Sequence, residues 1–167
     1  MMSTKLLLGW SLLLLTGCTS STLAPLVVDG PELHASLVTQ KLEDAAVLHL
    51  APALRDNPYL STDSAFVDVT ARMSSQGRLP GGEGVRAALY ALYLGESDIG
   101  LYGLEAESSA DADRIEGVLR AIWSHNAGLG LARVHRAGKV LVVVWSSPPS
   151  PSYWEAVNAK VVERLSR

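Results

Sequence analysis

The sequence has little cysteine and little charge. Its 167 residues include a single cysteine, Cys18, and one thiol excludes an internal disulfide or a cysteine-rich metal site. Charged residues make up 19% of the chain, and no basic block offsets the formal net charge of −3. Because nucleic-acid binding depends on clustered positive charge, we expect no nucleic-acid partner. After Cys18, no uncharged apolar run approaches the about 20 residues of a membrane-spanning helix.

The remaining composition is typical of one folded domain. Hydrophobic residues make up 48% of the chain, which is too many for an intrinsically disordered protein. A length of 167 residues fits a single domain. The sequence shows no internal repeat and no low-complexity tract.

The first 17 residues have the pattern of an export signal. Lys5 supplies one positive charge, and the apolar run Leu6–Leu15 follows, broken only by Gly9 and Ser11. A run of this length matches the apolar core of a signal peptide and is too short to span a bilayer.

The apolar run ends in the sequence Leu15-Thr16-Gly17-Cys18. This resembles the lipobox of bacterial lipoproteins, in which an aliphatic residue and two small residues precede the modified cysteine. The resemblance implies cleavage after Gly17 and a diacylglyceryl group on Cys18, and two or three acyl chains anchor a protein stably. Thr19 stands where an Asp favours inner-membrane retention in such lipoproteins, so we expect an outer-membrane anchor that faces the periplasm.

The expected organisation has three parts. Residues 1–17 are the signal peptide, and residues 18–31 are the acylated cysteine with a flexible tether, because Thr19–Pro25 is polar and ends in proline. Residues 32–167 form a single α+β domain. The bilayer is therefore the first expected partner, reached through Cys18.

Apolar periodicity predicts the elements of this domain. Helices are expected over residues 32–50, 85–94, 109–128 and 152–165, and strands over residues 65–73, 99–106, 129–136 and 139–146. The alternation over residues 65–73 favours a strand, with a helix as the alternative. Ser108-Ser109 supplies the expected serine cap of the third helix, and Ser152-Tyr153-Trp154-Glu155 is the expected capping box of the last.

These elements predict a small two-layer α+β fold, with a mixed sheet of three to four strands and the helices on one face. Val140–Trp145 is apolar at every position and is therefore expected to be a central, covered strand. Residues 129–136 carry more polar side chains, which suits an edge strand. A helical crossover would place residues 99–106 and 129–136 in parallel.

Three patterns have the residue types of a chemical site. The loop at residues 80–84 is glycine-rich, but it lacks the Lys-Ser/Thr ending of a phosphate-binding loop. The four histidines show no i, i+4 pair of the kind that binds a metal on a helix. Glu105 and Glu107 share a strand face about 7 Å apart, which suits an acid–base pair but more often marks a solvated rim. We expect no catalytic residue, metal or cofactor.

These observations favour a binding function over an enzymatic one. The domain is expected to act as an accessory module that binds another component of an envelope assembly, whether for secretion, motility, the surface or the cell wall. Tyr153, Pro149 and Pro151 form the expected contact patch. The alternatives are a small-ligand-binding lipoprotein and an anchored hydrolase. A deep pocket that brings together His125, His135, Glu105 and Glu107 would favour the hydrolase.

Overall fold

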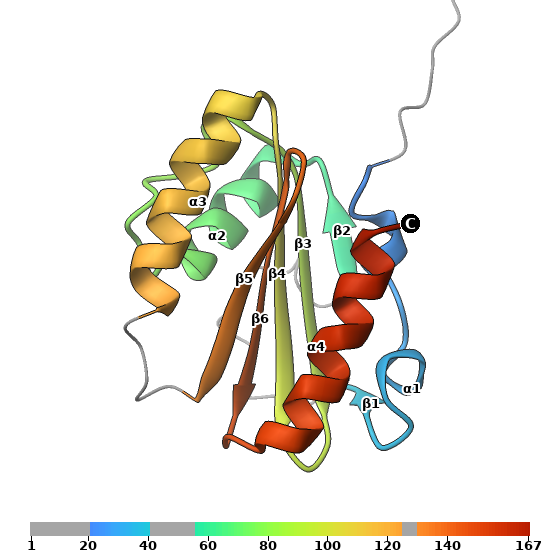
Figure 1. The fold of residues 1–167 in the computed structure, drawn as a ribbon. Helices are drawn as coiled ribbons and strands as arrows, with labels where there is room; N and C mark the ends of the chain where they lie inside the picture. The colour runs from blue at the N-terminus through green and yellow to red at the C-terminus, as the bar shows by residue number, and fades with distance from the viewer. Residues whose placement is uncertain (1–20, 41–55, 125–129) are drawn as a thin grey trace, which may run out of the picture.

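The computed structural model describes residues 21–40, 56–124 and 130–167. They fold into one six-stranded antiparallel sheet with helices against it (Figure 1). The elements are η1 (Ala24–Leu26), α1 (Gly30–Leu33), β1 (Val38–Thr39), β2 (Tyr59–Ser61), α2 (Ser64–Ser74), β3 (Val85–Leu94), β4 (Asp98–Ala106), α3 (Ser109–Trp123), β5 (Leu131–Ala137), β6 (Val140–Ser147) and α4 (Pro151–Leu165). Among these helices, none has the length and hydropathy needed to cross a bilayer.

Two hairpins make up most of the sheet, and a strand of one hairpin pairs with a strand of the other. The strand order is β1-β3-β4-β6-β5, with β2 also paired to β3. The first hairpin is β3–β4 and the second is β5–β6, and α3 connects them. Since β4 and β5 are both antiparallel to β6, they run in the same direction with β6 between them.

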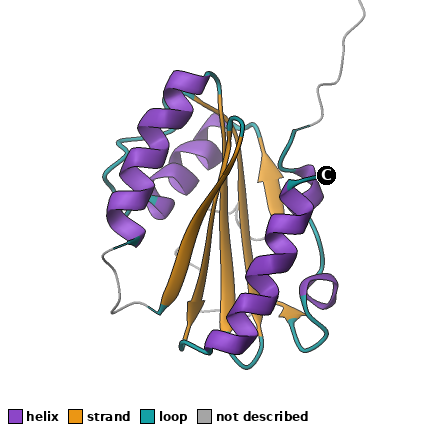
Figure 2. Cartoon of the chain, in the orientation of Figure 1, coloured by secondary structure: helices purple, strands orange, loops and turns teal. Residues whose placement is uncertain are grey.

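Both faces of the sheet are covered, so the domain has three layers (Figure 2). On the face that we call the α4 face, η1, α1 and α4 pack on the sheet. On the opposite face, the α3 face, α2 and α3 do so. Successive side chains along a strand point to opposite faces of the sheet and so enter different cores. In β6, Val142 lies in the core of the α4 face and Val143 in the core of the α3 face, and both are fully buried.

The predicted two-layer fold with three to four mixed strands is therefore wrong. The main error is at Val85–Leu94, which was expected to be a helix and is β3. Seven of the ten positions of this segment are buried, and its apolar residues fit a helical stripe as well as a strand. Pairing decides between the two: β3 bonds to β4 on one side and to β1 and β2 on the other. These contacts enlarge the sheet beyond the predicted size.

Two further segments differ from the favoured prediction. Residues 65–73 lie in α2, so the helical alternative is confirmed, and Asp63 caps this helix by accepting from the Phe66 backbone N–H at 3.1 Å. In the predicted helix at 32–50, α1 ends at Leu33 and β1 follows. Residues 41–50 of that prediction lie outside the described residues.

The C-terminal half matches the predicted elements more closely. The strand at 99–106, the helix capped by Ser108 and the hairpin of β5 and β6 are all confirmed. β6 is central and β5 is an edge strand, as expected. β4 and β5 run in the same direction, but β6 lies between them, so the two strands are not paired with each other. The N-cap residue of α4 is Ser150 rather than Ser152, and its side chain makes no capping hydrogen bond.

The expected flexible tether at residues 18–31 also needs correction. Leu23 and Leu26 are fully buried against the α4 face, and Tyr93 donates a hydrogen bond to the Val28 carbonyl at 3.0 Å. Apolar side chains held in a core cannot act as a spacer, because releasing them would expose their surface to water. Residues 21–31 therefore belong to the folded domain.

The position of β6 between two cores yields a prediction. Val142→Asp and Val143→Asp should each lower the free energy of unfolding by more than about 3 kcal/mol, because each places an unpaired carboxylate in a core. Val162→Asp is the matched control, since Val162 is 38% exposed on α4. Thermal and urea unfolding measure the effect. Tolerance of either β6 variant would contradict the burial of both faces.

Candidate functional site

Glu105 is a carboxylate buried near the end of β4. It lies beside Ala87 of β3 and Val140 of β6, and its side chain is 2% exposed. Ser21 Oγ donates a hydrogen bond to Glu105 Oε2 at 2.7 Å, and the Thr22 backbone N–H donates to the same oxygen at 3.2 Å. The Arg86 guanidinium forms an ion pair with the other carboxylate oxygen. Glu105 thus links residues 21–31, which we call the N-terminal segment, to the sheet.

These contacts determine the charge state of Glu105. Burial alone would raise the pKa of the carboxyl, but the hydrogen bonds from Ser21, Arg86 and Thr22 together hold that pKa below its ordinary value. The group is therefore ionised at neutral pH and compensated by its donors. A carboxylate in this state accepts hydrogen bonds and does not act as a general acid at pH 7.

A cavity of about 600 Å³ adjoins Glu105, and we call it the Glu105 pocket. It lies between the N-terminal segment, the β5–β6 turn and the C-terminal part of α4. Its lining residues are Ser21, Thr22, Ala24, Pro25, Arg86, Glu105, Ala137, Gly138, Lys139, Val140, Arg164, Leu165 and Arg167. The walls are largely aliphatic, and charged groups are concentrated in four basic side chains and Glu105.

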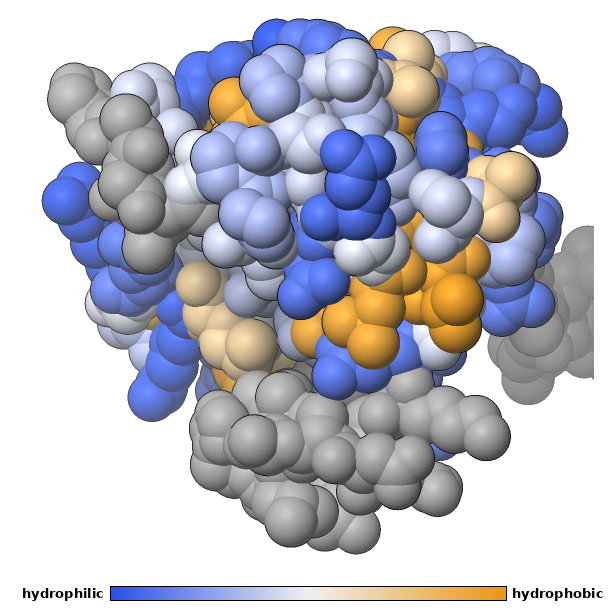
Figure 3. Space-filling model, turned by 90° about the horizontal axis from the view of Figure 1, so that it is seen from below, coloured by the Kyte–Doolittle hydropathy of each residue, from blue (hydrophilic) through white to orange (hydrophobic). Residues whose placement is uncertain are grey.

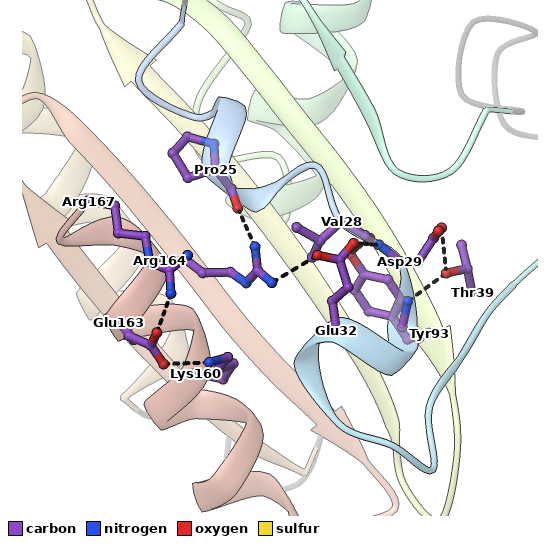
Figure 4. A network of polar contacts seen from close by, with 11 residues as sticks. Pro25, Val28, Asp29, Glu32, Thr39, Tyr93, Lys160, Glu163, Arg164 and Arg167 are labelled. Carbon is purple, nitrogen blue, oxygen red and sulfur yellow. Dashed lines mark hydrogen bonds and ion pairs between the residues drawn. The ribbon is translucent and has the colours of Figure 1, made fainter.

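The basic side chains of the Glu105 pocket come from distant parts of the chain. Arg164 donates to the Pro25 carbonyl at 3.4 Å and to Glu32 Oε2 at 3.1 Å (Figure 4). Its Nε–H is buried and has no partner among the described residues. Lys139 Nζ donates to the Glu107 carbonyl at 3.0 Å, and no carboxylate of the described residues forms an ion pair with it.

The opposite end of the domain carries apolar side chains in solvent. Val38 and Leu94 are paired across β1 and β3, and they are 64% and 39% exposed. Pro148 and Pro149 are exposed at the same end, where Ser97 Oγ donates to the Pro148 carbonyl at 2.7 Å. We call these four residues the Val38 surface. Figure 3 views this end of the molecule and shows hydrophobic side chains gathered on it.

Of the predicted contact patch, Tyr153 is buried, whereas the two prolines are exposed. Tyr153 is 6% exposed and belongs to the core of the α4 face, with its ring edge-on to His34 at 4.7 Å between centroids. It cannot form a surface contact, because α4 begins at Pro151 and turns its third residue toward the sheet. Pro149 and Pro151 are exposed, as expected.

The catalytic candidates are not brought together where the structure describes them. His135 lies on the edge strand with Nε2 at 2.7 Å from Asn158 Oδ1, and it does not line the Glu105 pocket. Glu107 is exposed and lines a separate cavity beside Asp68. Gly17, Cys18, His49 and His125 lie outside the described residues.

The remaining sequence motifs also have structural explanations. The glycine-rich loop leads into β3 rather than into a helix, so it lacks the helix N-terminus of a phosphate-binding loop. Within this loop, the Gly82 N–H donates to Asp68 Oδ1 at 2.6 Å. In residues 21–40, 56–124 and 130–167, no group of three His, Cys, Asp or Glu side chains could hold a metal ion.

Sequence reasoning missed the basic residues of the Glu105 pocket. They are single cations separated by up to about half of the chain, and only the register of β3 with β4 and the packing of α4 bring them together. No protein family, curated protein or solved structure was found to match the chain.

Glu105→Gln tests the electrostatic role of this carboxylate. At pH 7 the substitution should lower the free energy of unfolding by about 1–3 kcal/mol, because a buried ion pair and charge-assisted hydrogen bonds are lost. The folded-state pKa of Glu105 is depressed, so its stabilisation is complete above the ordinary value of 4.5 and disappears as pH falls through the folded-state pKa.

The measurement is urea unfolding of wild type and Glu105→Gln from pH 7 down to pH 3. The two stabilities should converge at the acid end. Glu107→Gln is the control and should leave the pH profile unchanged, since Glu107 is exposed. A constant difference between wild type and Glu105→Gln at every pH would contradict the assignment.

Proposed function

We propose that the chain is a bacterial envelope lipoprotein, held through Cys18 on the periplasmic side of the outer membrane, whose domain binds another envelope component. The observation that carries this proposal is the fixed position of the N-terminal segment. Ser21 is bonded to Glu105 and Leu23 is fully buried, only three and five residues after Cys18. Three residues span at most about 10 Å, so an acylated Cys18 would hold the domain against the bilayer.

Such a short connection gives the domain a defined orientation. The end that carries Ser21 and the Glu105 pocket faces the membrane, and the Val38 surface lies at the far end of the sheet (Figure 1). Exposed apolar side chains such as Val38 and Leu94 favour contact with another protein. The Val38 surface is therefore the proposed docking face for an envelope partner.

A small-ligand-binding function is the second candidate, and the Glu105 pocket is the observation that favours it. A volume of about 600 Å³ with largely aliphatic walls and a few charged groups is of the size and character of ligand sites. An anchored hydrolase has less support. Glu105 is engaged by three donors, and His135 lies outside the pocket.

The anchor is tested by Cys18→Ala. The variant should lose incorporation of labelled fatty acid and leave the membrane fraction, because the acyl chains supply the membrane affinity. Radiolabelling, followed by fractionation and immunoblotting, measures both effects. Retention of unlabelled Cys18→Ala protein in the membrane would refute the lipoprotein proposal.

The docking face is tested by photocrosslinking in intact cells. A photoreactive amino acid at Leu94 should give a discrete crosslinked product, whereas the same residue at Val162 should not. The two positions are matched, since both are aliphatic and are 39% and 38% exposed. Mass spectrometry then identifies the product. Crosslinks of equal yield at both positions, or at Val162 alone, would place the partner elsewhere.

A further inference from the structure

The lining of the Glu105 pocket is positively charged, whereas the chain as a whole is negatively charged. Four of its lining side chains are cationic, in a chain with a formal net charge of −3. Glu105, the pocket's own carboxylate, is already engaged by Ser21, Thr22 and Arg86. Arg164 and Arg167 are ion-paired with Glu32 and Glu163, and Glu163 is shared with Lys160, so the cations in and beside the pocket still outnumber the carboxylates. The remaining excess of positive charge favours an anionic ligand.

The basic groups differ in what they can offer to a ligand. Lys139 and Arg167 are exposed at the pocket, and Arg167 is paired with Glu163 Oε1 at 2.5 Å (Figure 4). The terminal nitrogens of Arg164 already donate to the Pro25 carbonyl and to Glu32, so Arg164 contributes positive charge to the pocket rather than a free donor. Guanidinium groups favour phosphate, because their planar N–H donors bind two oxygens at once.

The pocket also lies close to the proposed anchor. Ser21 lines it, and the three residues from Cys18 span at most about 10 Å. The polar headgroup layer on each side of a bilayer is about 5–8 Å thick. A pocket so near to the acyl chains would be within reach of neighbouring headgroups.

We propose that the Glu105 pocket binds the phosphate of an anionic lipid in the leaflet that holds Cys18. The inference rests on the proposed function, since an acylated Cys18 brings the pocket to the bilayer. Lys139 and Arg167 bind the phosphate oxygens, Arg164 adds positive charge, and the aliphatic side chains of Pro25 and Leu165 contact the glycerol and the first methylenes. Headgroup capture would fix the rotation of the domain about its anchor and keep the Val38 surface directed away from the membrane.

The test is calorimetric titration of the full chain, purified in non-ionic detergent, with dihexanoyl phosphatidylglycerol. The variant is Lys139→Gln/Arg167→Gln, which leaves the Arg86–Glu105 pair intact. The matched control is Arg72→Gln/Arg78→Gln, which removes two exposed arginines that do not line the pocket. Partitioning of the lipid into micelles is the same for all three proteins and cancels in the comparison.

Wild type and control should bind the lipid with equal affinity, and the Lys139→Gln/Arg167→Gln variant about 25-fold more weakly, at about fivefold for each cation removed. Binding should also weaken at 0.5 M salt. Equal affinity of the variant and wild type, or no binding at all, would overturn the proposal. Equally tight binding of dihexanoyl phosphatidylcholine would exclude selection by charge.

Glycerol 3-phosphate distinguishes a lipid from a soluble phosphate ester. Binding as tight as that of the lipid would assign the pocket to a soluble ligand and overturn the lipid proposal. Both phosphate compounds are soluble, so the titration does not depend on acylation of Cys18. If the lipoprotein proposal is wrong, the fractionation of Cys18→Ala will show it. If the lipid-binding proposal alone is wrong, only this titration will show it.

Discussion

Burial of both faces of the sheet is the constraint on which the rest of the structure depends. Successive residues of β6, such as Val142 and Val143, enter different cores, so neither face tolerates water. The α3 face is covered by helices from the middle of the chain. The α4 face needs the N-terminal segment together with α4, because these two elements share its surface. The N-terminal segment and α4 thus form one shared layer on the α4 face, and this layer holds Ser21 and the lining of the Glu105 pocket in position.

The same constraint explains which elements the sequence could predict. Val140–Trp145 is apolar at every position, and the inference of a central strand is correct because valine and tryptophan favour strands. Val85–Leu94 is apolar except at Arg86, but its alanines and leucines favour helices, and only pairing with β1, β2 and β4 overrides that preference. At α2, the alternation over residues 65–73 is misleading, and the cap at Asp63 was the signal that could have corrected it.

The candidate site was less predictable, since its contacts are distant in the sequence. Glu105 stood out as a carboxylate at the end of a strand, but its burial depends on Ser21, which is 84 residues away. Its partner Arg86 lay in a segment expected to be helical, where the register that brings the two together does not exist. A local pattern carries no information about such pairs, whereas correct strand pairing would have placed Arg86 beside Glu105.

The shared layer on the α4 face has a consequence for the order of folding. Arg164 and the Pro25 carbonyl are separated by 139 residues, and such non-local contacts form late. A chain exported from its N-terminus would present the segment around Leu23 long before α4 emerges. During that interval Leu23 and Leu26 lack the helix that completes their layer, so their side chains stay exposed to water. In the proposed lipoprotein, Ser21 and Leu23 would therefore reach their folded positions only after α4 has been exported.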